Sequence, residues 1–144
     1  MLLLLPFYTP KDKKRNDEIR NVLNLHVSNK CIKKIILLVD DDTFSVEKPN
    51  SEKISICRFD RRPTFCDWIK ESKKYVDEFE LITCANGDIE FSDNFESLAL
   101  KELKDKKSVL CISRYEQTNK NQITLHKNPK WSQDTWCIRS EDLN

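Results

Sequence analysis

The chain has 144 residues, enough for one domain with a buried core but too few for two such cores. Its 25 basic and 24 acidic residues give a formal net charge of +1, so charge provides no argument for a nucleic-acid partner. Three Trp and seven Phe residues argue against a disordered chain.

Neither the N-terminus nor the cysteines point to secretion or to a metal cluster. Residues 1–5 resemble the start of a signal peptide, but no basic segment precedes them and Pro6 ends the apolar run too early. No stretch approaches the roughly 20 apolar residues of a membrane span. The cysteines form no Cys-x-x-Cys pair, and four lie in apolar runs: Cys57, Cys84, Cys111 and Cys137. We therefore expect buried free thiols in a reducing, cytoplasmic compartment.

In chain order, apolar strand-like runs alternate with helical patterns. Residues 2–7 predict a buried strand, and the charged segment 11–29 carries apolar side chains at helical spacing. His26 lies on that apolar face, and we expect it to pack there because no second histidine is near it. Residues 32–39 predict a second buried strand, which runs into the carboxylates of Asp40-Asp41-Asp42.

The alternation continues to the end of the chain. Thr64 suits the N-cap of a second helix, with Asp67 at the third helical position of a capping box. Further strands are expected at 54–59, 80–85, 108–113 and within 131–139, a third helix near 93–103, and a polar segment of little periodicity at 117–130. The pattern predicts a single α/β domain over residues 1–144, with helices on both faces of a mainly parallel sheet.

The stretch Leu81–Phe91 combines a buried strand with polar residues at its end. It breaks at Asn86-Gly87, a turn dipeptide that contains the only glycine of the chain, and Asp88 follows at once. Glycine permits backbone angles and close approaches that side chains block. One interpretation is a metal and phosphate site with Asn86 and Asp88 as oxygen ligands, because open α/β sheets bind ligands at such strand ends. The other is an ordinary turn between two elements.

The remaining strand ends supply more charged groups, namely Asp40, Arg62, Arg114 and, nearby, Asp134. If the strands are parallel, these side chains collect at one edge of the sheet. A single glycine cannot form a Walker or Rossmann phosphate loop, and no Gly-x-Ser-x-Gly elbow is present. Acidic ligands with arginines are instead suited to a metal-bridged diphosphate.

Several short blocks follow one another along nearly the whole chain: Arg15-Asn16-x-Glu18, Arg62-Pro63-Thr64-Phe65, Ala85-Asn86-Gly87-Asp88-Ile89-x-Phe91, Leu110-x-x-Ser113-Arg114-Tyr115-Glu116 and Ser132-Gln133-Asp134-x-Trp136. In this order they resemble small bacterial and viral glycosyltransferases of the GT-A type, including those encoded by large algal viruses. The Asn-x-Asp-Ile and Ser-Gln-Asp-x-Trp blocks are the most specific.

This resemblance implies a transferase that uses a UDP-sugar donor, Mn²⁺ or Mg²⁺, and a glycan or other hydroxyl acceptor. Asp88 corresponds to the main metal ligand, with Asn86 where the family usually has Asp. The nucleotide-sugar site would comprise Arg62, Thr64, Arg114 and Gln133. The resemblance also implies that Asp134 is the base for the acceptor hydroxyl and that Asp40 meets the uracil.

Other interpretations stay open at this point. Similar proteins usually continue beyond Trp136 into a segment of the acceptor pocket, so the chain could be a minimal domain, a truncated product or donor-binding only. A non-catalytic nucleotide-sugar or glycan-binding module is the main alternative. Metal-dependent phosphoryl transfer through residues 40–42 with Asp88 is a third. Asp134 could also simply bond a backbone amide.

Overall fold

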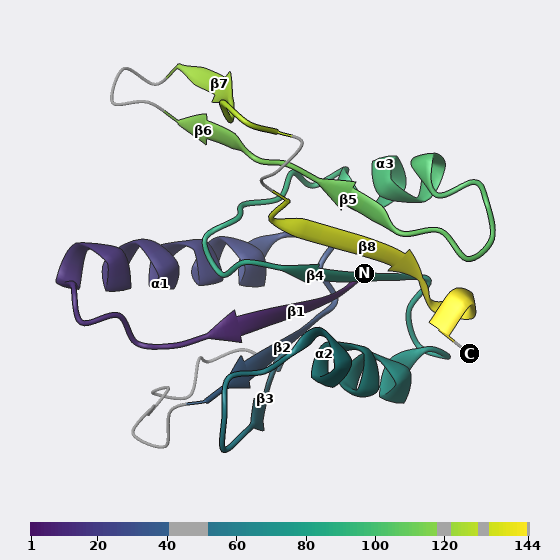
Figure 1. Ribbon diagram of the computed structural model, residues 1–144, viewed down its shortest axis with the longest axis horizontal. Coiled ribbons are helices and arrows are strands. Elements are labelled where there is room, and N and C mark those ends of the chain that lie inside the picture. Colours follow the sequence, from purple (N-terminus) through teal and green to yellow (C-terminus); the bar gives the residue numbers. More distant parts are fainter. Residues whose placement is uncertain (41–51, 118–121, 130–132, 144) are drawn as a thin grey trace.

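The computed structural model describes residues 1–40, 52–117, 122–129 and 133–143, and it has a six-stranded sheet at its centre (Figure 1). The strand order is β3-β2-β1-β4-β8-β5. The strands span β1 Leu2–Phe7, β2 Lys34–Val39, β3 Ile54–Arg58, β4 Leu81–Ala85, β5 Leu110–Ile112 and β8 Thr135–Arg139. The β1–β2, β1–β4 and β2–β3 pairs are parallel, which confirms the prediction of a mainly parallel α/β sheet.

The exception is β8, which runs antiparallel to both of its neighbours, β4 and β5. In Figure 1 the arrowheads of β1 and β2 lie on the left and that of β8 lies on the right. Because β5 is antiparallel to β8, β5 runs in the same direction as β4. The carboxyl ends of β1 to β5 therefore share one edge of the sheet with the first residue of β8.

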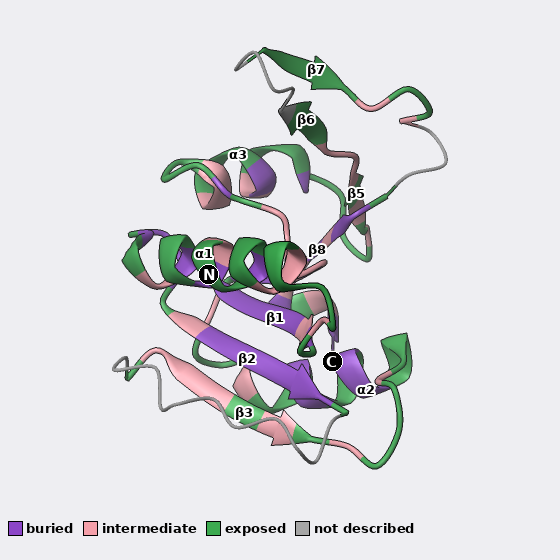
Figure 2. Ribbon diagram, turned by 90° about the vertical axis from the view of Figure 1, so that its left-hand side faces the viewer, coloured by how far each residue is buried: buried purple, intermediate pink, exposed green. Residues whose placement is uncertain are grey.

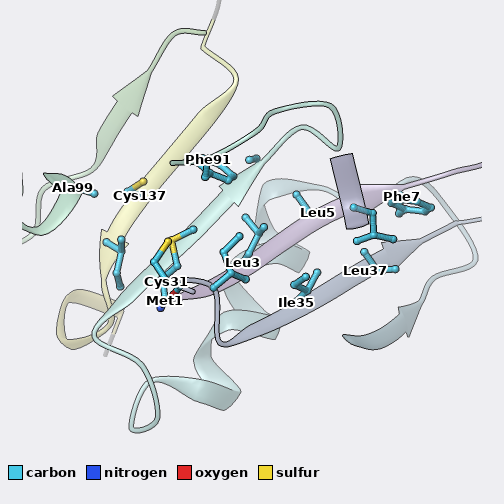
Figure 3. Close-up of a cluster of buried hydrophobic side chains, with 14 of the residues drawn as sticks. Met1, Leu3, Leu5, Phe7, Cys31, Ile35, Leu37, Phe91, Ala99 and Cys137 are labelled. Carbon is cyan, nitrogen blue, oxygen red and sulfur yellow. Dashed lines mark hydrogen bonds between the residues drawn. The ribbon is translucent and has the colours of Figure 1, made fainter. Parts of the chain in front are cut away.

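Helices cover both faces of the sheet, as predicted. One face carries α1 Lys13–Ser28 and α3 Phe95–Glu102, which pack on the buried cluster drawn in Figure 3. The other carries α2 Phe65–Ser72, followed by the short 3₁₀ turn η1 Lys73–Tyr75, and the C-terminal turn η2 Ser140–Leu143. Successive residues of β1 alternate between the two clusters, so Leu3 and Leu5 face α1 while Leu2 and Leu4 face α2. Figure 2 shows β1 and β2 buried along most of their length.

Two local predictions were wrong. The polar segment after β5 contains a two-stranded sheet, β6 Tyr115–Gln117 with β7 Ile123–Leu125, whose strands are too short to give a periodic signal. Cys111 is exposed, because β5 is an edge strand with a neighbour on one side only.

All six cysteines are free, but their burial differs. Cys31 and Cys137 are buried, while Cys66 is exposed like Cys111. Burial raises the pKa of the Cys137 thiol to about 11. Among the described residues, no helix has the length and apolar character that a membrane span requires.

Candidate functional site

A cleft of about 640 Å³ lies at the carboxyl edge of the sheet. The end of β1, the first turns of α1, the turn after β4, the segment before α2 and Arg114 form its walls. The chain leaves β1 toward β2 on one side, and β4 lies on the other, so the strand order reverses between β1 and β4. Their pairing ends at Leu4 and Cys84, before either strand ends. Ligands of open α/β sheets bind at such a reversal point.

The structure brings most of the predicted site residues to this cleft. The lining includes Asp40, Arg62, Asn86, Asp88 and Arg114. Asp41 and Asp42, the rest of the alternative metal site, lie outside the described residues, as does Ser132 of the last sequence block. The sequence prediction that charged strand ends gather at one edge is confirmed for the residues that the structure describes.

The turn that carries Asp88 is held by α1. The Arg15 Nη2 atom lies 2.6 Å from Oδ2 of Asp88, and one turn later Ile19 lies next to Gly87. Near the end of α1, His26 bonds the carbonyl oxygen of Ile89 through Nε2 at 2.6 Å. The contacts from Arg15, Ile19 and His26 fall on one side of the helix, so α1 fixes the turn against the sheet.

Two buried polar residues, His26 in α1 and Asn29 directly after it, also hold this segment. His26 is buried, as the sequence predicted, and its pKa is lowered chiefly because burial disfavours the charged ring. Its Nδ1 atom has no hydrogen-bond partner among the described residues. The amide of Asn29 donates to the carbonyl oxygen of Phe91 at 2.8 Å. Neither His26 nor Asn29 was predicted to support the site, because their partners lie more than sixty residues away in the chain.

Asp134 occupies the junction of β4, β5 and β8 and is only 5% exposed. Its Oδ1 atom accepts hydrogen bonds from Nη1 of Arg114 at 2.7 Å and from the amide of Asn86 at 3.0 Å. Its backbone N–H donates to the carbonyl oxygen of Ile112, and its own carbonyl accepts from the N–H of Asn86. Asp134 thus ties two cleft residues, Arg114 and Asn86, to the sheet.

The predicted capping box at the start of α2 is confirmed. The carboxylate of Asp67 accepts the backbone N–H and the hydroxyl of Thr64, each at 2.8 Å. Arg61 binds the same carboxylate with both of its terminal nitrogens, at 2.7 and 3.0 Å. Arg61, and then the Thr64 backbone, hold the pKa of Asp67 well below its usual range.

This arrangement separates residues that the sequence grouped together. Arg61 is committed to Asp67, whereas Arg62 lines the cleft. Thr64 is exposed, its hydroxyl donates to Asp67, and it does not line the cleft. Gln133 is exposed and also lies outside the lining. Of the predicted nucleotide-sugar residues, Arg62 and Arg114 therefore face the cleft.

The cleft offers few protein ligands for a divalent ion. No group of three or more His, Cys, Asp or Glu side chains is placed to hold a metal among the described residues. Asp88 and Asn86 offer a carboxylate and an amide oxygen at the cleft wall, and one carboxylate oxygen already contacts Arg15. Mg²⁺ is commonly held by one or two carboxylates together with substrate phosphates. Asp88 and Asn86 would supply part of the ligands of such an ion and a phosphorylated ligand would supply more, since the described residues do not form a complete cage.

The strand order and the cleft at its reversal point define a small α/β domain of the nucleotidyltransferase-like, GT-A-like fold. A solved structure with this fold is 4-diphosphocytidyl-2C-methyl-D-erythritol synthase from Anaerococcus prevotii, with a TM-score of 0.57 and 13% sequence identity. The match covers 97% of this chain and 69% of that enzyme. Comparison of the sequence with protein-family models and with curated proteins finds no match.

Proposed function

We propose that the protein is a metal-dependent glycosyltransferase that moves a sugar from a nucleotide-diphosphate sugar, with UDP as the nucleotide, to a glycan or another hydroxyl acceptor. The observation that carries the proposal is the cleft itself, where Arg62 and Arg114 face Asp88 and Asn86 at the reversal point of the sheet. Arginines bind phosphate oxygens with two parallel hydrogen bonds, and a carboxylate with an amide oxygen suits Mn²⁺ or Mg²⁺.

Each cleft residue has a role in this proposal. Asp88 and Asn86 hold the ion together with the donor diphosphate, and the ion, when bound, neutralises charge on the leaving group. Arg62 and Arg114 bind the diphosphate and the sugar. Thr64 acts indirectly, because its bonds to Asp67 fix the segment that carries Arg62.

The acceptor side depends on Asp134, which does not line the cleft itself but bonds the cleft residues Arg114 and Asn86. Asp134 takes the proton of the acceptor hydroxyl, and Gln133 contacts the nucleotide sugar from its exposed position beside it. Asp40, at the end of β2, contacts the uracil.

The fold neighbour supports the coarser part of the proposal. Its name describes a synthase of a diphosphocytidyl compound, so a protein of the same fold makes a product that contains a nucleoside diphosphate group. Because one fold hosts many reactions, the likeness does not choose between glycosyl and nucleotidyl transfer. The choice of glycosyl transfer rests on the sequence blocks around Asp88 and Asp134.

A thermal-shift screen of nucleotide sugars, with and without Mn²⁺, tests the proposal. A ligand at one hundred times its Kd stabilises the fold by about 2.7 kcal/mol, which raises Tm by roughly 5–10 °C in a chain of this size. We expect a shift with UDP-sugars that depends on Mn²⁺ and that Asp88→Ala abolishes. Asp77→Ala, which removes an exposed carboxylate outside the cleft, serves as the matched control. A Mn²⁺-dependent shift that persists in Asp88→Ala would exclude Asp88 as the ligand.

A second candidate, a non-catalytic nucleotide-sugar-binding module, is favoured by the state of Asp134. A carboxylate that is 5% exposed and accepts hydrogen bonds from Arg114 and Asn86 is a structural link as much as a base. Transfer or hydrolysis of the donor by the wild type would exclude this candidate. Binding without either reaction would support it.

A further inference from the structure

We propose that Arg15 exchanges partners when ligands bind. Its guanidinium pairs with Asp88 in the absence of ligands and moves to the donor diphosphate when an ion binds Asp88. This inference rests on the proposed function and assigns a residue to it. Arg15 belongs to one of the sequence blocks but had no predicted role there. It lines the same cleft as Asp88, Arg62 and Arg114.

The competition follows from the contacts of Arg15. Its Nη2 atom lies 2.6 Å from Oδ2 of Asp88, and its Nη1 atom lies 2.7 Å from Oε2 of Glu18. An ion that takes Asp88 as a ligand must approach the carboxylate that already carries this guanidinium. Two cations cannot share one carboxylate closely without repelling each other. Ion binding therefore weakens the bond between Arg15 and Asp88.

The backbone around Asp88 is held by other contacts. Ile19 lies next to Gly87, and His26 and Asn29 bond the carbonyl oxygens of Ile89 and Phe91, so these contacts tie the turn to α1 and the residue after it. The side chain of Arg15 is 38% exposed, whereas that of Asp88 is 23% exposed. The long, more exposed side chain is the part that moves. Glu18 keeps it at the cleft wall, where the nearest new anion is the diphosphate.

The proposal gives two effects of opposite sign in Arg15→Gln. Without donor, Mn²⁺ should bind about two- to fivefold more tightly, because it no longer displaces a partly exposed ion pair. With saturating Mn²⁺, UDP should bind roughly tenfold or more weakly, because a charge-assisted hydrogen bond to phosphate is lost. A residue that only stabilises the fold would not tighten ion binding while loosening nucleotide binding.

Arg20→Gln is the matched control. Arg20 lies on the same helix and the substitution removes the same charge, but its side chain is exposed, bonds Asn16 and does not line the cleft. Both dissociation constants of this variant should stay within twofold of wild type. Arg15→Lys, which retains the charge, should return Mn²⁺ affinity toward wild type.

The experiment is Mn²⁺ titration followed by electron paramagnetic resonance of the free ion, and calorimetric titration of UDP at saturating Mn²⁺. Opposite changes in Arg15→Gln, absent in Arg20→Gln, are the expected result. If wild type binds both probes and Arg15→Gln weakens both or changes neither, the exchange is overturned and the proposed function stands. If wild type binds neither probe, the proposed function fails and the exchange falls with it.

Discussion

Replacing Asp134 by Asn removes one negative charge from the junction of β4, β5 and β8 and keeps the size of the side chain. The carbonyl oxygen of the new amide can still accept the hydrogen bond from Asn86, which is 3.0 Å long in the wild type. What is lost is the charge on the partner of Arg114, whose Nη1 atom lies 2.7 Å from the carboxylate. The substitution therefore tests one ion pair and one proposed base together.

The structure sets the expected cost in stability. Hydrogen bonds to charged groups contribute about 1.5–3 kcal/mol. The side chain of Arg114 is 34% exposed, so water replaces part of the lost interaction and the lower half of that range applies. A loss of about 1.5–2 kcal/mol lowers Tm by roughly 3–8 °C. If Asp134 is the base, transfer at saturating substrates falls by roughly 10²–10⁴, with donor affinity within a few-fold of wild type.

Three measurements on Asp134→Asn separate these roles: a thermal melt, UDP titration with Mn²⁺, and transfer at saturating donor and acceptor. Asp77→Asn is the matched control for the change in charge, since Asp77 is exposed and outside the cleft. Near-normal transfer by Asp134→Asn would refute the base role. Equal losses of donor affinity and transfer would instead assign Asp134 to holding Arg114 and Asn86. An unchanged Tm would refute the stabilisation of about 1.5–2 kcal/mol that we assign to the ion pair of Arg114 with Asp134.

Two further predictions follow from the burial of His26 and from the different exposure of the cysteines. His26 stays neutral in the fold because burial lowers its pKa, whereas the unfolded chain takes up a proton below about pH 6.5, so stability should fall as pH drops from about 7 to 5. Chemical denaturation across this range should show a smaller fall in His26→Gln, and equal slopes would contradict the assignment. In thiol labelling of native protein without reductant, exposed Cys66 and Cys111 should react first, with all six thiols reactive after denaturation; fewer than six would contradict free cysteines.

The buried sheet was largely predictable because its signal is local. Runs such as Leu2–Phe7 and Lys34–Val39 are apolar on both faces, which is what a central parallel strand between two helical layers requires. The capping box at Thr64 was equally predictable, since Thr64 and Asp67 lie only three residues apart in the sequence. The direction of β8 was not predicted, yet it decides the site. Because β8 is antiparallel, its beginning, and not its end, places Asp134 beside the cleft residues Asn86 and Arg114.

The roles of single side chains were less predictable because they depend on contacts between distant segments. Nothing around Arg15 distinguishes it from its charged neighbours on α1, and its partner Asp88 lies 73 residues away. Arg61 and Arg62 are adjacent and identical in type, but one binds Asp67 and the other faces the cleft. Such choices follow from where the backbone places each side chain after the sheet and helices have packed.

Gly87 shows how a correct position can come with a wrong physical reason. The glycine does mark the turn at the cleft, but its φ angle does not lie in the left-handed region. A Cβ built there would lie 3.4 Å from the carbonyl oxygen of Pro6 and 3.8 Å from Cγ2 of Ile19, both ordinary contacts. Neither an unusual backbone angle nor a lack of space therefore requires glycine at position 87, and an alanine would fit there. What matters for the site is the turn itself, which brings Asp88 within hydrogen-bonding distance of Arg15 and joins the strand end to the helix that holds it.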